Sequence, residues 1–195
     1  MELFYHGTSV IFDKFDLRHA LEGDGKVKFG FGVYVTSKYT TAAHYAGSNK
    51  AAERFYVYSV EIPDMTDDNH IDYQQPVHPA ILHRAEEKLG EPIPPEATGN
   101  AGKEFRKYLG NRLTGKLASV KKMMSKTDLE GEKAASAFLD SIGVDYIVWP
   151  VDWKNPDKGT NRAVLNDAKV RIVQVDEVSL DDKKQLIPGT EKRVR

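Results

Sequence analysis

Short segments that favour β-strands lie near both ends of the chain, and segments typical of helices lie between them. Residues 3–5, 31–37 and 54–63 are rich in aromatic and β-branched side chains and are bounded by glycine, proline or polar residues. Residues 161–166 and 170–178 are predicted as strands near the other end. Because strands and helices do not alternate along the chain, as a doubly wound parallel sheet requires, the sequence predicts an α+β fold.

Capping and breaking residues predict the helices. A short helix follows residue 38, with Thr40 or Thr41 as its N-cap and Gly47 as its end. Further segments follow in order: a helix within 79–90, a helix pair within 103–126 interrupted at 110–115, a helix from 129 to Gly143, and a strand through Ile147 and Trp149.

Length and composition indicate a globular protein with one core. The chain has 195 residues, 40% of them hydrophobic and 29% charged, which fits a single domain over residues 1–195. Proline and aspartate are frequent after residue 63, and few strand signals follow until residue 146. We therefore expect an insertion of helices and loops at about 64–140.

Several function classes are excluded by composition. The net charge of −1 excludes a basic body that coats nucleic acid or anionic membrane. The absence of cysteine excludes disulfides, thiolate catalysis and cysteine zinc sites, and it fits a reducing, cytoplasmic location. No signal peptide and no membrane span are predicted. His78 and His83 do not form a metal-binding pattern, so no metal is expected.

Three short motifs in the first 45 residues are candidates for chemistry. His6-Gly7-Thr8 ends the first predicted strand, the run "GVYV" places Tyr34 on the second, and Tyr45 follows eleven residues later on the predicted helix. Each one taken alone is typical of an ordinary core or strand-end residue.

Taken in this order and at these spacings, the motifs resemble the ADP-ribosyltransferase class that includes diphtheria toxin and the poly-ADP-ribose polymerases. The segments "EKAASAFLDSIGVDYIVW" and "NRAVLND" are similar to a branch of this class found in polyvalent proteins of phages and mobile elements. The resemblance covers roughly residues 3–175. It implies an ADP-ribosyltransferase fold, which is a split mixed or antiparallel β-sandwich core with flanking helices.

The resemblance also implies a set of roles toward NAD⁺, the co-substrate of the class. Two tyrosine faces would sandwich the cationic nicotinamide ring, the backbone of Gly7 would bond its carboxamide, and His6 and Thr8 would bind ribose hydroxyls. Arg18 is a candidate for the pyrophosphate, whereas Lys28 is either a second candidate or a solvated charge. The resulting assignment is catalytic roles for His6, Tyr34 and Asn161, and NAD⁺ binding by His6, Gly7, Thr8, Arg18, Tyr34, Thr41 and Tyr45.

Two positions depart from the pattern of the class. Ala42 stands where the polymerases have a carboxamide-binding serine, which leaves the neighbouring Thr41 as a substitute. Asn161 stands where they have the catalytic glutamate. An asparagine can orient a ribose hydroxyl but cannot supply negative charge to an oxocarbenium-like transition state, so chain elongation is not expected. Glu177 lies beyond this position and is expected to be a surface charge.

The acceptor of ADP-ribose is left open between nucleic acid and protein. Residues 103–126 hold eight basic residues and one acid, which suits a phosphate backbone but equally suits a solvated helix face. The candidate contacts are Lys103, Arg106, Lys107, Arg112, Lys116, Lys121, Lys122 and Lys126. The hypotheses are a mono-ADP-ribosyltransferase acting as a bacterial or phage toxin or effector with an antitoxin partner, an NAD⁺ glycohydrolase, and a non-catalytic NAD- or nucleic-acid-binding module.

Overall fold

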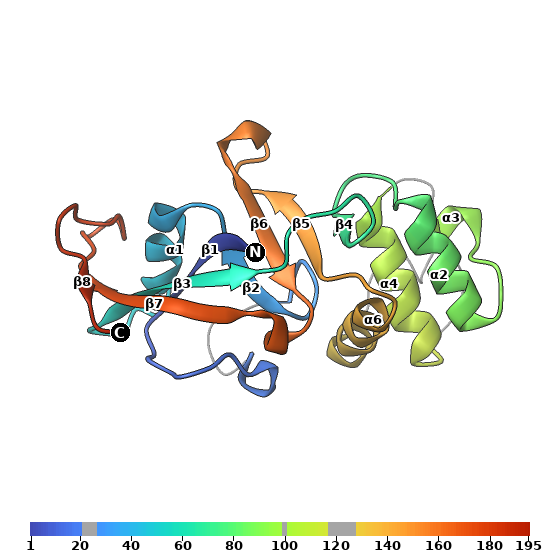
Figure 1. Ribbon diagram of the computed structural model, residues 1–195, viewed down its shortest axis with the longest axis horizontal. Coiled ribbons are helices and arrows are strands. Elements are labelled where there is room, and N and C mark those ends of the chain that lie inside the picture. The colour runs from blue at the N-terminus through green and yellow to red at the C-terminus, as the bar shows by residue number, and fades with distance from the viewer. Residues whose placement is uncertain (21–26, 99–100, 117–127) are drawn as a thin grey trace. The chain divides into compact units, whose positions relative to one another are not determined.

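The chain divides into two compact units, each with helices and strands, so the fold is of the mixed α+β kind (Figure 1). The computed structural model describes residues 1–20, 27–98, 101–116 and 128–195. The first unit comprises Met1–Lys26, Val33–Asp64 and Pro150–Arg195, and the second comprises Val27–Gly32 and Met65–Trp149.

The first unit is built on an antiparallel sheet in which β6, β2, β1, β3, β7 and β8 are successive neighbours. The strands are β1 (Glu2–Thr8), β2 (Val33–Thr36), β3 (Phe55–Ile62), β6 (Thr160–Val164), β7 (Arg171–Val178) and β8 (Lys192–Arg193). All of them except β8 were predicted. The two residues of β8 lie in the charged tail, where no strand pattern is visible.

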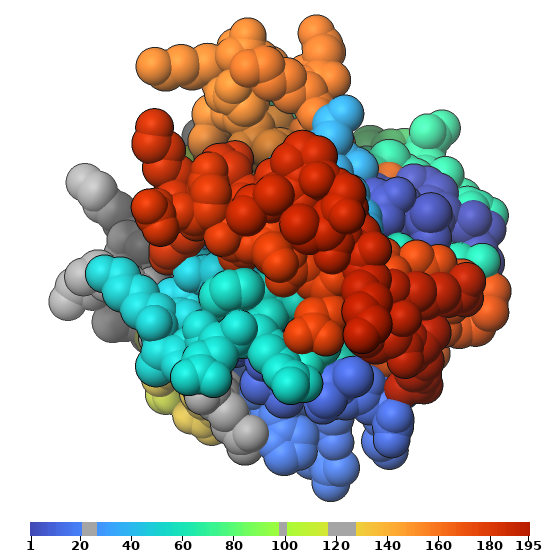
Figure 2. All heavy atoms as spheres, turned by 90° about the vertical axis from the view of Figure 1, so that its left-hand side faces the viewer, coloured from blue at the N-terminus to red at the C-terminus, as the bar shows by residue number. Residues whose placement is uncertain are grey.

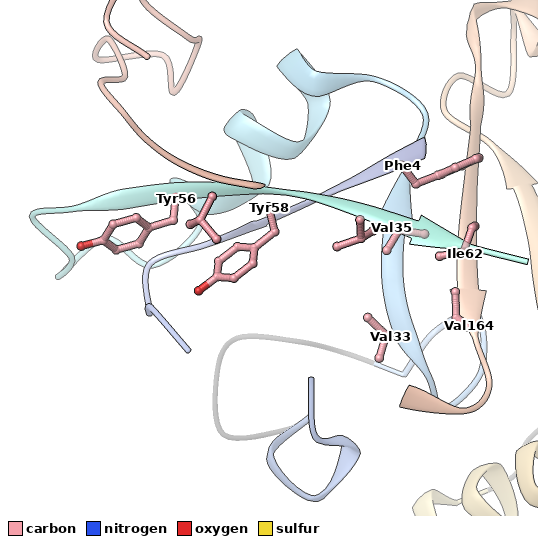
Figure 3. Close-up of a cluster of buried hydrophobic side chains, with 9 residues drawn as sticks. Phe4, Val33, Val35, Tyr56, Tyr58, Ile62 and Val164 are labelled. Atoms are coloured by element: carbon pink, nitrogen blue, oxygen red, sulfur yellow. The ribbon is translucent and has the colours of Figure 1, made fainter. Parts of the chain in front are cut away.

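One face of this sheet carries the larger apolar cluster. Its buried members are Phe4, Val33, Val35, Tyr56, Tyr58, Val60, Ile62, Val164 and Val175. Figure 3 shows the side chains of Tyr56 and Tyr58 pointing from β3 to the side of the sheet opposite helix α1. Phe12 and Phe15, from the segment after β1, pack against the cluster and cover it.

Helix α1 (Tyr39–Ala46) covers the other face. Its N-cap is Lys38, which makes no side-chain capping bond, so the prediction of Thr40 or Thr41 as the cap is wrong. The chain enters the helix almost directly from β2, which places both threonines inside the first turns. The helix ends at Gly47, as predicted.

The C-terminal segment after β7 returns over the same side of the unit as α1. Leu180 and Leu186 pack against the small cluster of Ala42, Ala43, Val57 and Val178 beneath the helix. In Figure 2 these C-terminal residues (red) lie beside the residues that connect α1 to β3 (cyan).

The second unit holds four helices and two strands among its described residues. They are β4 (His70–Asp72), α2 (Pro79–Leu89), α3 (Pro95–Thr98), α4 (Gly102–Leu113), α6 (Leu129–Ser141) and β5 (Tyr146–Pro150), with β4 and β5 parallel. The predicted break at residue 110 is wrong, because α4 continues through the buried Gly110 and Asn111 to Leu113. β4 and α3 were not predicted, since three or four residues show no periodicity.

Candidate functional site

His6 lies on β1 with its ring in the larger apolar cluster. The ring makes an edge contact with Phe15 at 5.1 Å between centroids and lies near Phe12 and Tyr58. Its Nδ1 lies 2.7 Å from the carbonyl oxygen of Tyr34. A carbonyl only accepts, so Nδ1 donates and Nε2 is the acceptor of the neutral ring. Burial lowers the pKa of His6, and the bond to Tyr34 opposes this shift in part.

This bond marks the point where β1 and β2 separate. β1 pairs with β3 along all seven of its residues, but among the described residues it pairs with β2 only at Tyr5 and Thr36. If the ladder continued, Gly7 would face Tyr34, yet the imidazole of His6 takes the Tyr34 carbonyl instead. Backbone groups released from a ladder in this way need other partners, and a ligand is one of them.

Gly7 is required by the close approach of α1. A Cβ added at Gly7 would lie 1.7 Å from the carbonyl oxygen of Ala42 and 2.9 Å from the amide nitrogen of Ala46. The sequence suggested that glycine keeps the backbone open to a ligand; the structure adds that no other residue lets the helix sit here. Ala42 is fully buried in this contact, so it serves packing.

The register brings Tyr34 and Asn161 to the face that α1 covers. Tyr34 pairs with Ala163 and Thr36 with Asn161 in the β2–β6 ladder. Directly opposed residues share a face, and residues two apart on one strand share it as well. Tyr34 and Asn161 are therefore diagonal neighbours, about 7–8 Å apart at their Cα atoms. Tyr5 pairs with Thr36, so the next residue, His6, points its ring to the opposite face of the sheet. The ring comes close to Tyr34 only where β1 and β2 separate.

Asn161 is 4% exposed, and its side chain is not fully bonded. Its Nδ2 lies 3.5 Å from the Pro150 carbonyl, and no donor among the described residues reaches its Oδ1. A buried amide oxygen without a partner is costly and is uncommon in folded proteins. Asn161 therefore holds an unused acceptor on the α1 face.

The corner before Asn161 is held by Ser37, a residue that the sequence analysis did not single out. Its Oγ accepts the Thr160 N–H at 3.0 Å, and its own N–H donates to the Thr160 carbonyl at 2.9 Å. These two bonds fix the β2–β6 register at the end where Asn161 stands. A serine at the end of a predicted strand is common where a turn begins, so it gave no signal in the sequence.

Thr41 and Tyr45 are one turn apart and share a flank of α1. Tyr45 is 51% exposed. The opposite flank, with His44 and Gly47, contacts Lys184 of the C-terminal segment. That segment and β7 lie to the β3 side of β1, whereas β2 lies to the other side. The Thr41–Tyr45 flank is therefore the one directed toward β2 and Tyr34.

Thr8 and Arg18 are not brought into this group. The Oγ1 of Thr8 accepts the Val10 N–H at 3.2 Å and so stabilises the turn after β1. The exposed Arg18 is bonded to the carboxylate of Asp16, whose pKa it lowers strongly. Arg18 lines a shallow pocket of about 580 Å³ with Lys14, Phe15, Asp16, Leu17, Asp167, Ala168 and Val170. Since Phe15 also contacts His6, this pocket adjoins the His6 cluster.

Lys28 and Glu177 lie outside this group, and each has a nearby side chain as a partner. The ammonium of Lys28 lies 5.2 Å from the centroid of the Phe29 ring. Glu177, on β7, lies 3.8 Å from the guanidinium of Arg54.

The basic segment of the second unit is less available than its sequence suggested. Arg106 is 1% exposed and pairs with the buried Glu132, so its assignment as a nucleic-acid contact is wrong. Its position on α4 faces α6, which the charge pattern alone could not reveal. Arg112 pairs with Glu91 at 2.6 Å.

The remaining basic candidates fall into three groups. Lys116 pairs with Asp128 and Glu130 at 2.6 and 2.7 Å, whereas Lys103 and Lys107 are half-buried on α4. Lys121, Lys122 and Lys126 lie outside the described residues.

Within the described residues, no three His, Cys, Asp or Glu side chains gather as metal ligands, and no helix is long and apolar enough to cross a membrane. Comparisons with protein-family models, with curated proteins and with solved structures each found no match for the chain.

Proposed function

We propose that the protein is a mono-ADP-ribosyltransferase that cleaves NAD⁺ and transfers ADP-ribose to a macromolecular acceptor. The observation that supports this most is the grouping on the α1 face. There the β2–β6 register sets Tyr34 diagonal to Asn161, whose amide oxygen has no donor among the described residues, and α1 directs Thr41 and Tyr45 toward them. His6 adds an imidazole acceptor where β1 leaves β2.

The chemistry assigned to these side chains follows from their properties. The rings of Tyr34 and Tyr45 attract the cationic nicotinamide, each by about 0.5–2 kcal/mol. The Oδ1 of Asn161 accepts a hydroxyl of the nicotinamide ribose, and Nε2 of His6 accepts a hydroxyl of the other ribose. The glycosidic C–N bond then breaks with its electron pair going to nicotinamide, and the acceptor's nucleophile bonds the ribose carbon. A nucleophile that still carries a proton loses it to water, and an anionic one has none to lose.

Asn161 limits the reaction to acceptors that are already good nucleophiles. A neutral amide cannot take a proton from the acceptor or supply negative charge to the ribose cation. A phosphate, a carboxylate or a base-activated hydroxyl has already lost its proton and itself brings negative charge to the ribose cation. This residue also favours the second candidate, a module that binds NAD⁺ without turnover.

One experiment separates the candidates. NAD⁺ labelled in its adenylate phosphate is incubated with the protein and a bacterial lysate, and denatured samples are treated in parallel with ribonuclease, deoxyribonuclease or protease. Transfer predicts label that stays with a macromolecule and is released by one of the three enzymes. Nicotinamide release without labelled macromolecule would identify a glycohydrolase, and NAD⁺ binding without release would identify the binding module.

The Asn161→Ala variant tests the assigned role of the amide. We expect turnover to fall about 2- to 10-fold, as for the loss of one neutral hydrogen bond, with a smaller change in the Kd for NAD⁺. Stability should change little, because the oxygen removed has no donor among the described residues. Unchanged turnover would remove Asn161 from the site. The role of toxin or effector, with an antitoxin partner in the cytoplasm, rests on the family resemblance alone.

A further inference from the structure

A buried carboxylate lies beneath the first turn of α1. Asp176 on β7 is 5% exposed, and its register opposite Val57 puts it on the α1 face. The phenol of Tyr39 donates to its Oδ2 at 3.0 Å, and the amide of Gln174 donates to both oxygens at 2.8 and 3.0 Å. A buried carboxylate is tolerated only where such donors offset its lost hydration.

Tyr39 is the first residue of α1, and its side chain connects the start of the helix to β7 and β1. Lys38 makes no side-chain bond to the helix. Instead, the Tyr39 hydroxyl reaches Asp176 on one side, while its ring packs edge-on against Tyr5 at 5.3 Å between centroids. The pKa of Tyr39 is raised, first by burial and then by the bond to Asp176, so the phenol stays protonated and donates.

Two of the contacts that hold α1, at Gly7 and at Tyr39, restrain different motions. The Gly7 contact with Ala42 sets how closely the helix backbone approaches β1. The hydrogen bond from the Tyr39 side chain to β7 acts away from this contact and resists rotation of the helix about its axis. Rotation of α1 about its axis would move the Thr41–Tyr45 flank by the same angle as the rest of the helix. A rotation of about 100° would bring side chains one position along the sequence to the place of this flank.

We propose that Tyr39 and Asp176 are positioning residues that set the rotation of α1 and hence the place of Thr41 and Tyr45 opposite Tyr34. The inference rests on the proposed function in one respect, that this flank binds NAD⁺. Neither residue touches the substrate. They hold the ring of Tyr45 in position before NAD⁺ binds. Their loss therefore weakens NAD⁺ binding, although no contact to NAD⁺ is removed.

The test uses Tyr39→Phe, which removes the hydroxyl and keeps the ring against Tyr5. Tyr108→Phe is the matched control, because Tyr108 is a buried tyrosine of the second unit outside the site. Calorimetric titration with NAD⁺ should give a Kd about tenfold higher for Tyr39→Phe and unchanged for Tyr108→Phe. Asp176→Asn keeps one oxygen as an acceptor for the phenol and should raise the Kd less than Tyr39→Phe does. Combining it with Tyr39→Phe should add little to the effect of Tyr39→Phe alone.

Hydrogen exchange on the NAD⁺-free protein supplies the second measurement. Exchange of the amides of α1 should be faster in Tyr39→Phe than in the wild type and unaltered in Tyr108→Phe. Equal Kd values for the wild type and Tyr39→Phe, or equal exchange rates, would overturn the inference while leaving the proposed function intact. A wild type that does not bind NAD⁺ would instead overturn the proposed function, and the exchange rates would still decide whether the pair restrains α1.

Discussion

The two faces of the first unit's sheet are built from different kinds of residue. One face is closed by large apolar side chains, including Tyr58, Val60 and Ile62, none of which is exposed. The α1 face has a smaller apolar cluster, to which the helix contributes only alanines, and it holds the buried polar side chains of Thr36, Asn161 and Asp176. A continuous apolar cluster stabilises the fold, whereas buried polar groups reduce stability unless bonded. The apolar face therefore contributes most of the packing, whereas most residues of the proposed site lie on the α1 face and His6 reaches it from the apolar face.

The largest effect should follow from Ile62→Ala on the apolar face. Ile62 is fully buried, so we expect a loss of about 2–5 kcal/mol in the free energy of unfolding. Urea denaturation measures the loss, and titration of the folded protein should show an unchanged Kd for NAD⁺. A Kd that rises with the loss of stability would show that the two faces are not separable.

Gly7→Ala tests the other face through its packing. The added methyl would overlap the Ala42 carbonyl, so α1 must shift, at a cost of about 1–3 kcal/mol. Unlike Ile62→Ala, this variant should also lose NAD⁺ affinity, because the shift moves Thr41 and Tyr45. Gly90→Ala is the control: its φ is +71° but no atom lies near, so it should cost stability without changing NAD⁺ binding. Retained affinity in Gly7→Ala would argue against a site between α1 and β2.

Tyr45→Ala should weaken NAD⁺ binding and leave the free energy of unfolding nearly unchanged, which is the reverse of the effect expected for Ile62→Ala. Tyr45 is 51% exposed, so its removal should alter the free energy of unfolding by less than about 0.5 kcal/mol. Loss of one cation–π contact should raise the Kd for NAD⁺ about 2- to 30-fold. Trp153→Ala, at an aromatic residue of similar exposure, should leave the Kd unchanged. Equal effects of the two variants would remove Tyr45 from the site.

The elements of the first unit were largely predictable because their patterns are local. Alternation over 54–63 and the glycine at position 47 needed no knowledge of neighbours, and β3 and α1 follow them. The start of α1 was missed because its N-cap, Lys38, makes no side-chain capping bond, and the side chain of Tyr39 instead bonds Asp176, 137 residues away in the sequence. Capping rules describe local bonds only, so they selected the threonines.

The candidate site was predictable in its residue types but not in its geometry. The order His6, Tyr34, Tyr45 is visible in the sequence, whereas the opposite orientation of His6 depends on the β1–β2 register. The reason for Gly7 lies in the backbone of α1, and the burial of Arg106 depends on its pairing with Glu132. Each of these three features depends on a contact between residues far apart in the sequence, and composition and motif spacing do not predict such contacts.

The smallest expected effect is on the pH dependence of stability and concerns His6. Its ring lies in the apolar cluster, and its Nδ1 donates to the Tyr34 carbonyl where β1 and β2 separate. Burial lowers its pKa in the folded protein, so between that value and the unfolded value of about 6.5 the unfolded chain binds more protons. The contribution of His6 to stability is therefore fully present above pH 6.5 and is lost as the pH falls through the folded pKa, by at most about 1.4 kcal/mol per pH unit. Urea denaturation of the wild type and of His6→Gln, whose amide still donates a hydrogen bond, measures this slope between pH 7.5 and 5.5.

His83→Gln, at an exposed histidine of the second unit, is the control for replacing a histidine by glutamine elsewhere in the chain. The slope of stability against pH should be smaller in His6→Gln than in either the wild type or His83→Gln. If His6→Gln keeps the wild-type slope, the ring is protonated with equal ease in the folded and unfolded protein. Its place among Phe12, Phe15 and Tyr58 would then not withdraw it from water, and the apolar face would be open at the point where it meets the site.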